Sequence, residues 1–240
     1  MFKISLISAA FLLSFNAANA ATFTIIDDFS TGQAEIETDV STFPAGVGAT
    51  AAGGGILGGK RGMRVVSQQA GNGFYTSSAV TNDFLVFSNS ALDAGAVKLG
   101  YGGGLGLGGF DLTSAGQATE FVIDLISSDL QFGVLVRAKD TYNNVSTLRA
   151  NMPGRGVAPT AVKLAFTDFT GSADLTSLHQ LSFSFFNGSG DLDFVIDDIT
   201  TAGVPLPNPV PGPSPVPLPA GAVLLATALG ALKLRSRARN

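Results

Sequence analysis

Gln180-Leu181-Ser182-Phe183-Ser184-Phe185 is a stretch in which polar and apolar residues alternate. In residues 132–136, apolar residues likewise recur with a period near two. Because successive side chains of a β-strand point to opposite faces, this alternation buries one face of a sheet and leaves the other open to solvent. Both stretches therefore predict antiparallel strands with one side in a hydrophobic core.

Further short runs rich in Val, Ile, Phe and Thr continue the pattern along the chain, and clusters of Gly, Asn, Asp and Ser separate them. The runs cover residues 22–29, 64–68, 84–87, 96–101, 119–125, 131–139, 146–151, 161–165, 180–186 and 194–200. Many short strands without intervening helices predict an all-β fold, an antiparallel jelly-roll or β-sandwich of two sheets. With 18 Phe, 3 Tyr and no Trp, we expect a core of stacked aromatic rings and little of the indole surface that favours sugar binding.

Charge and composition exclude several classes of protein. Five of the 14 basic residues lie before residue 21 or after residue 203, which leaves nine against 18 acidic residues and a net charge of −9 between them. Such a surface repels nucleic acid. With no Cys and His179 as the single histidine, a zinc site of the usual kind is excluded. We interpret His179 as a residue at the entry to a strand.

The first twenty residues predict a signal peptide. Lys3 is followed by an apolar run over residues 4–15, which is too short to span a membrane comfortably. Ala18-Asn19-Ala20 then gives the small-x-small pattern that signal peptidase requires, so we expect cleavage between Ala20 and Ala21. The sequence therefore predicts an exported domain over residues 21–203.

The other end has three parts in a fixed order. Residues 204–219 are rich in proline and predict an extended linker, residues 220–232 are apolar or small, and four basic residues follow at Lys233, Arg235, Arg237 and Arg239. Basic residues beside an apolar segment stay on the cytoplasmic side of a membrane. We therefore expect a short transmembrane helix that holds the domain on the outside.

The tail resembles a known sorting signal. Val216-Pro217-Leu218-Pro219-Ala220, the apolar segment and the basic residues, together residues 216–240, are similar to the VPLPA-CTERM variant of the PEP-CTERM signal. The resemblance implies that an exosortase-type membrane enzyme recognises the tail and cuts near the motif. The domain would be anchored in the membrane only transiently before it reaches the cell surface or extracellular matrix. An ordinary anchor without processing is the alternative.

Two glycine-rich stretches imitate nucleotide-binding motifs. Residues 54–60 have phosphate-loop spacing, but Arg61 stands where Ser or Thr would hold magnesium. Residues 104–109 fit a dinucleotide fingerprint, but β-like sequence follows where a helix should begin. We predict loops or bulges at both places.

Paired carboxylates end the first and last predicted strands, at Asp27-Asp28 and at Asp197-Asp198. This similarity suggests that the two strands lie side by side. The segments also resemble jelly-roll domains of the carbohydrate-binding-module type, in which acidic residues of the end strands often hold a structural calcium. The resemblance assigns calcium first to Asp28 and Asp198 and second to Asp27 and Asp197. Solvated charges at strand ends are the alternative.

These features favour an exported, non-catalytic surface or matrix protein, with exopolysaccharide as a candidate partner. If it binds sugar, Tyr75, Tyr101 and Tyr142 are the candidate stacking residues.

Two alternatives remain open. The first is a secreted glycan-cleaving enzyme of jelly-roll fold, in which Glu35 with Glu37 or Asp191 with Asp193 would form the carboxylate pair that glycosidases need. The second is a purely structural adhesin.

Overall fold

The computed structural model of the 240-residue chain describes residues 21–68, 74–91, 93–154, 159–188 and 190–203. The predicted signal peptide, the proline-rich linker and the sorting signal with its motif lie outside these residues. Among the described residues, no helix has the length and apolar character needed to cross a membrane.

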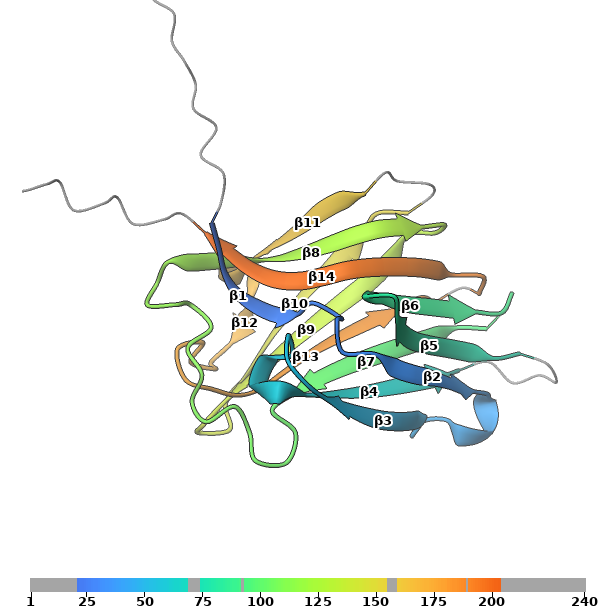
Figure 1. The fold of residues 1–240 in the computed structure, drawn as a ribbon, viewed down its shortest axis with the longest axis horizontal. Coiled ribbons are helices and arrows are strands. Elements are labelled where there is room, and N and C mark those ends of the chain that lie inside the picture. Colours follow the sequence, from blue (N-terminus) through green and yellow to red (C-terminus); the bar gives the residue numbers. More distant parts are fainter. Residues whose placement is uncertain (1–20, 69–73, 92, 155–158, 189, 204–240) are drawn as a thin grey trace, which may run out of the picture. The chain divides into compact units, whose positions relative to one another are not determined.

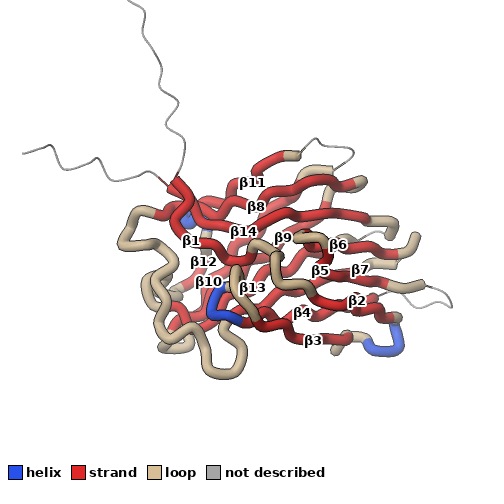
Figure 2. Tube along the Cα trace, in the orientation of Figure 1, coloured by secondary structure: helices blue, strands red, loops and turns tan. Residues whose placement is uncertain are grey.

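Two antiparallel sheets pack face to face, so the all-β sandwich predicted from the sequence is confirmed (Figures 1 and 2). The first sheet, called sheet A here, has the order β11 (Thr160–Ala165), β8 (Ala118–Ser128), β14 (Asp193–Gly203), β6 (Phe84–Asn89), β5 (Thr76–Thr81) and β2 (Gln33–Thr38), with β1 (Ala21–Asp27) paired to β14. Sheet B has the order β12 (Thr170–Gly171), β10 (Val145–Met152), β9 (Phe132–Asp140), β13 (Leu178–Phe186), β7 (Gly95–Tyr101), β4 (Lys60–Ser67) and β3 (Val47–Ala52). Three short 3-10 turns lie at Val40–Thr42, Leu57–Gly59 and Phe166–Asp168.

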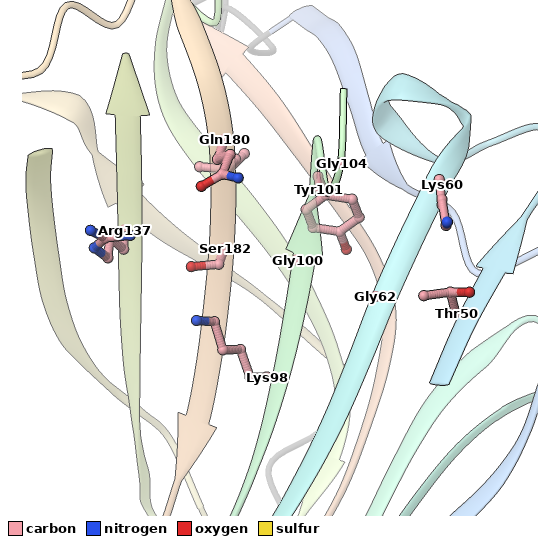
Figure 3. A pocket seen from close by; sticks show the side chains of 12 residues that line it. Thr50, Lys60, Gly62, Lys98, Gly100, Tyr101, Gly104, Arg137, Gln180 and Ser182 are labelled. Carbon is pink, nitrogen blue, oxygen red and sulfur yellow. The ribbon is translucent and has the colours of Figure 1, made fainter. Parts of the chain in front are cut away.

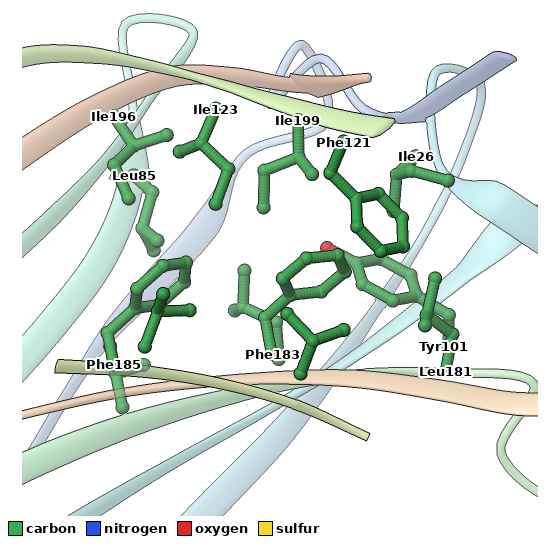
Figure 4. Packing of buried hydrophobic residues seen from close by; sticks show 14 of the residues in the cluster. Ile26, Leu85, Tyr101, Phe121, Ile123, Leu181, Phe183, Phe185, Ile196 and Ile199 are labelled. Carbon is green, nitrogen blue, oxygen red and sulfur yellow. The ribbon is translucent and has the colours of Figure 1, made fainter. Parts of the chain in front are cut away.

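The core lies between the sheets and is built from alternating residues of each strand. In β13, Leu181, Phe183 and Phe185 are buried while Ser182 and Ser184 face outward, as the alternation predicts. Figure 4 shows Phe183 and Phe185 from sheet B below Ile196 and Ile199 from sheet A.

Aromatic rings join the two sheets within this core. The ring centroids of Phe121 and Phe183 lie 5.1 Å apart with the rings edge to face, and those of Phe132 and Phe194 lie 4.6 Å apart in a stack. Such pairs add to the stabilisation from burial alone. The aromatic core expected from the phenylalanine content is confirmed.

The first and last strands lie side by side, as their paired carboxylates suggested. β1 runs antiparallel to β14, with Ala21 opposite Gly203 and Asp27 opposite Ile199. The register shifts twice along this pair.

The strands β3 and β5 have weak sequence signals, and we did not expect them. Their sequences, Val-Gly-Ala-Thr-Ala-Ala and Thr-Ser-Ser-Ala-Val-Thr, mix Val and Thr with Gly, Ala and Ser and contain no aromatic residue, Ile or Leu. They become strands because they pair with β4 and β6, respectively. Tertiary pairing therefore decides their conformation.

Both glycine-rich stretches form turns and loops in place of nucleotide sites, as predicted. Gly106 has a φ of +78°, and a Cβ there would meet the ring of His179. Residues with a side chain rarely adopt this φ, so the backbone conformation favours glycine here. His179 is the second residue of β13, which agrees with its interpretation as a strand-entry residue.

Candidate functional site

The outward face of sheet B is hollowed where strands β3, β4, β7, β13 and β9 lie next to one another (Figure 3). The hollow has a volume of about 430 Å³ and is called the trough here. It is lined by Thr50, Lys60, Gly62, Lys98, Gly100, Tyr101, Gly103, Gly104, Arg137, Gln180, Leu181 and Ser182.

The floor of the trough is made by two glycines that lie opposite each other. Gly62 of β4 pairs with Gly100 of β7, and Thr50 and Ser182 continue the same row on β3 and β13. A Cβ at Gly62 would have only the Gly100 carbonyl oxygen within 4 Å, at 3.7 Å, and neither glycine has a positive φ. The backbone therefore does not require glycine here. The missing side chains hollow the sheet.

Cationic and amide side chains surround this floor. Lys60, Lys98 and Arg137 come from β4, β7 and β9, and Gln180 comes from β13 (Figure 3). Partial burial lowers the pKa of Lys98, and the positive charges of Arg137 and Arg64 lower it further. The trough therefore offers hydrogen-bond donors in a positive field, with hydroxyl and amide groups between them.

Tyr101 has no exposed ring for stacking, so this candidate from the sequence is wrong. Its backbone lines the trough, but its side chain points into the core and is 1% exposed (Figure 4). The phenol donates a hydrogen bond to Asp27 Oδ2 at 2.9 Å. Burial raises the tyrosine pKa, and the negative charge of Asp27 raises it further. The ring is therefore a structural element.

The other two tyrosines are exposed but lie elsewhere. Tyr75, 45% exposed, directly precedes β5 of sheet A, and Tyr142, 80% exposed, lies in the turn between β9 and β10. Neither lines the trough. The structure thus does not bring the three predicted stacking residues together.

Asp27 takes part in a buried ion pair, which removes it from the candidate calcium ligands. Both of its carboxylate oxygens accept hydrogen bonds from Arg61 Nη1, at 2.8 and 3.0 Å, and both side chains are fully buried. Oδ1 also accepts from the Phe29 amide at 3.0 Å. Burial raises the pKa of Asp27, although the Arg61 charge opposes the shift. Because both oxygens are occupied, the Asp27 carboxylate links β1 of sheet A to β4 of sheet B through Arg61.

The other three acidic candidates lie close enough together to interact. Burial raises the pKa of Asp198 to about 6, and the negative charges of Asp124, Asp197 and Asp28 add to the shift. The strand β14 is irregular here, because Ile196 pairs with Leu125 whereas Ile199 pairs with Ile123. Asp197 and Asp198 therefore both lie opposite the single residue Asp124, as the two residues of a bulge do.

These carboxylates fit a calcium ion only in part. Asp198 Oδ1 is buried and has no hydrogen-bond partner among the described residues, so it is an orphaned acceptor. Asp28 is occupied in part, since its Oδ1 accepts from the amide and the hydroxyl of Ser30 at 3.0 and 2.6 Å. No three Asp, Glu or His side chains of the described residues converge as a metal-binding group.

The acidic pairs considered for glycan cleavage lie away from the trough. Glu35 and Glu37 are exposed on β2 of sheet A, next to a register shift. Asp191 precedes β14 with a φ of +70°, and Asp193 begins that strand. None of the four residues lines the trough.

The trough itself was missed from the sequence, although part of its signal was present. Alternation in β7 places Lys98 and Gly100 on the face opposite to Leu99 and Tyr101. A glycine and a lysine on the outward face of a strand are ordinary features alone. They become a site only through the pairing of Gly100 with Gly62, which no local pattern gives.

Neither a model of a protein family nor a curated protein matches this sequence. Among solved structures, the chain is similar to the family 11 carbohydrate-binding module of the cellulosomal cellulase Lic26A-Cel5E of Clostridium thermocellum. The identity is 12% and the TM-score 0.41, over 79% of this chain and 99% of that chain. A family 11 module from Clostridium thermocellum in complex with a β-1,3-1,4-mixed-linked tetrasaccharide gives 13% identity and a TM-score of 0.36, over 73% and 98% of the two chains. At these values the ligand of this chain has to be inferred from its own residues.

Proposed function

We propose that this protein is an exported, non-catalytic glycan-binding protein of the cell surface or extracellular matrix, and that the trough binds the glycan. The observation that carries the proposal is the opposed pair Gly62 and Gly100, which removes side chains from the middle of a sheet face without any backbone need. Glycine weakens a strand interior, so two at facing positions call for a reason outside folding. Close approach of a ligand to the backbone supplies that reason.

The groups around this floor suit a sugar polymer. Thr50, Ser182 and Gln180 can each donate and accept hydrogen bonds, as sugar hydroxyls require. The row of Thr50, Gly62, Gly100 and Ser182 crosses four neighbouring strands, a distance of roughly 14 Å at the usual strand spacing. A site of this length can bind several sugar units of a polysaccharide and is longer than a single sugar needs.

The proposal is tested by native gel electrophoresis of the purified full-length protein through gels that contain a panel of soluble polysaccharides. We expect slower migration with at least one polysaccharide. The Gly62→Val/Gly100→Val variant should migrate freely in that gel, because two branched side chains fill the floor. Its melting temperature should be unchanged or higher, since valine favours strands.

A matched control is Ala161→Val, which adds the same kind of side chain to an exposed position of β11 in sheet A. It should be retarded like the wild type. Unretarded migration of the wild type with every polysaccharide would reject glycan binding. Release of reducing ends from a bound polysaccharide would reject the non-catalytic part of the proposal.

Export and sorting belong to the same proposal and rest on the sequence of the two ends. Signal peptidase would cut between Ala20 and Ala21. An exosortase-type enzyme would recognise the motif Val216-Pro217-Leu218-Pro219-Ala220 and cut the chain near it. We expect the mature amino terminus to be Ala21 by Edman sequencing. A cell fractionation should place the protein outside the inner membrane. Full-length protein in the cytosol would contradict both steps.

A structural calcium held by Asp198, with Asp28 as the second carboxylate, is a second, separate proposal, which the orphaned Asp198 oxygen favours. Calcium takes oxygen ligands, and a cation that binds only the folded protein raises its melting temperature. The melting temperature should therefore rise when calcium is added to protein stripped with a chelator. Asp198→Asn should lose most of this rise, whereas Asp83→Asn should keep it. An unchanged wild-type midpoint would reject the metal.

A further inference from the structure

The cations of the domain are concentrated on one face. Of the eight Lys and Arg residues within the part of the chain that the structure describes, six lie on the outward face of sheet B. They are Lys60, Arg64, Lys98, Arg137, Lys139 and Arg149. Arg61 points inward from the same sheet, and Lys163 lies in sheet A with Glu120 as its ion-pair partner.

Acidic residues are absent from this face within the described strands. The strands of sheet B contain a single carboxylate, Asp140, which is 1% exposed and accepts hydrogen bonds from surrounding backbone groups. Sheet A contains most of the strand carboxylates, among them Glu35, Glu37 and Asp124. A domain with a strongly negative net charge therefore presents one positive sheet face.

The positive face works against the stability of the fold. Arg64 of β4 lies directly opposite Lys98 of β7, and like charges in facing positions repel. Neither ion pair found among the described residues includes any of the six cations. The lowered pKa of Lys98 has burial as its first cause and the charges of Arg137 and Arg64 as the others. A local conflict without a compensating contact in the fold points to function.

The trough lies within this face and supplies charge in place of aromatic stacking. Lys60, Lys98 and Arg137 line it, whereas the ring of Tyr101 is buried on the other side of the sheet. Lys and Arg donate hydrogen bonds and accept none, so three of them suit a ligand that carries many acceptors with negative charge. A neutral sugar polymer would gain little from them.

We propose that the trough binds an acidic polysaccharide, whose carboxylate or sulfate groups pair with Lys98, Arg137 and their cationic neighbours. This inference rests on the proposed glycan-binding function and names the class of glycan. A nucleic acid is the weaker match, because single strands are usually held by exposed aromatic rings that stack with the bases. Phe186, an aromatic residue on this face of β13, already packs against Arg149, whose guanidinium carbon lies 5.6 Å from its ring centroid.

Two matched pairs of polymers test the charge requirement on the purified full-length protein. The first pair is polygalacturonate and its fully methyl-esterified form, and the second is dextran sulfate and dextran. We expect the anionic member of at least one pair to bind at least about tenfold more tightly, since a hydrogen bond to a charged group contributes roughly that factor. Raising the salt concentration should weaken this binding, because exposed charges are screened.

The Lys98→Gln/Arg137→Gln variant should lose about tenfold or more of this affinity by the same reasoning. Lys163→Gln removes an exposed cation of sheet A and should bind like the wild type. The melting temperature of each variant shows whether it is folded.

The outcomes separate this inference from the function on which it rests. Equal binding to the charged and neutral members of both pairs would overturn the inference and leave glycan binding intact. No binding to any polymer would overturn both. Binding of poly-dT as tight as that of the acidic polysaccharide would also overturn the inference, because the face would then recognise charge without regard to sugar.

Discussion

Arg61 and Arg64 lie three residues apart on β4 and face opposite sides of sheet B. Arg61 is fully buried and donates to Asp27, to Gln33 Oε1 at 3.0 Å and to the Thr31 carbonyl at 2.7 Å. Arg64 is exposed, lies opposite Lys98, and belongs to no ion pair of the described residues. Where a cation serves the fold, the chain supplies its acceptors. On the outward face, the chain supplies Arg64 with no ion-pair partner among the described residues, so its charge is left to solvent or to a ligand.

The largest expected change in stability comes from removing the buried, paired Arg61. Arg61→Met should lower the free energy of unfolding by about 3–5 kcal/mol, because Asp27 is left as a buried charge without its partner. Urea denaturation measures the change. Arg64→Met, on the outward face, should change it by less than about 0.5 kcal/mol.

The double variant Asp27→Leu/Arg61→Met checks the physical reason. Removing both charges together should restore part of the lost stability, since the cost lies in the unpaired charge and not in the missing bond. A double variant that is as unstable as the sum of the two single variants would contradict this account.

Asp198 is a half-buried carboxylate without a cationic partner among the described residues, and it should make stability depend on pH. Its pKa is raised from 3.8 to about 6, so between these pH values the folded state binds more protons than the unfolded state. Stability therefore falls as pH rises from about 4 to 6, by about 1 kcal/mol after allowance for solvent screening.

The measurement compares the wild type with Asp198→Asn in chelator across pH 4–8. The difference isolates this group from Asp111 and Asp140, whose pKa values are lowered and whose contributions have the opposite sign. Asp198→Asn should be the more stable protein at pH 7. A less stable variant in the presence of calcium, but not in chelator, would instead support the metal site.

Lys98 gives a prediction for the unpaired cations of the outward face. Lys98→Met should raise the free energy of unfolding by about 0.5 kcal/mol, because it removes repulsion from Arg64 and Arg137 and keeps the apolar stem. The gain should shrink in 1 M salt, where the wild-type repulsion is screened. Arg149→Met is the control and should give no gain, since Arg149 packs on Phe186. A loss of stability in Lys98→Met would mean that the cation supports the fold.

The smallest effect is expected for a cation that is paired but exposed. Lys163 Nζ lies 2.7 Å from Glu120 Oε1, and the lysine side chain is 56% exposed. A double-mutant cycle with Lys163→Ala and Glu120→Ala should give a coupling energy below about 0.5 kcal/mol at physiological salt. If the coupling energy of Lys163 and Glu120 were close to that of the buried pair Arg61 and Asp27, burial would not explain why the two ion pairs differ.

Much of the fold could be predicted from alternation, and most of the site could not. The period in Leu181, Phe183 and Phe185 identifies both a strand and its buried face. The same period in β7 places Tyr101 on the buried face with Leu99. The prediction that Tyr101 stacks against sugar overlooked this signal, because it used only the chemistry of tyrosine.

The prediction of Asp27 as a calcium ligand was wrong for a different reason. Asp27 and Asp28 are adjacent and chemically identical, yet the first meets Arg61 in the core and the second lies at the surface of a loop. Local sequence does not report which residue of another strand will face a given carboxylate. The trough depended in the same way on the pairing of Gly62 with Gly100, which are far apart in the chain.

The antiparallel pairing of β1 with β14 places Ala21 directly opposite Gly203, so the domain is entered and left at one corner. Any pull on the chain beyond Gly203 acts first on β14, which is bonded to β8 and β6 as well as to β1. Bonds between antiparallel strands lie across the strand direction, so a pull along β14 loads the whole ladder together. If the domain is tethered by this end and binds a polymer on sheet B, as proposed, a pull between the two strains β14 in shear and does not unzip it from an edge.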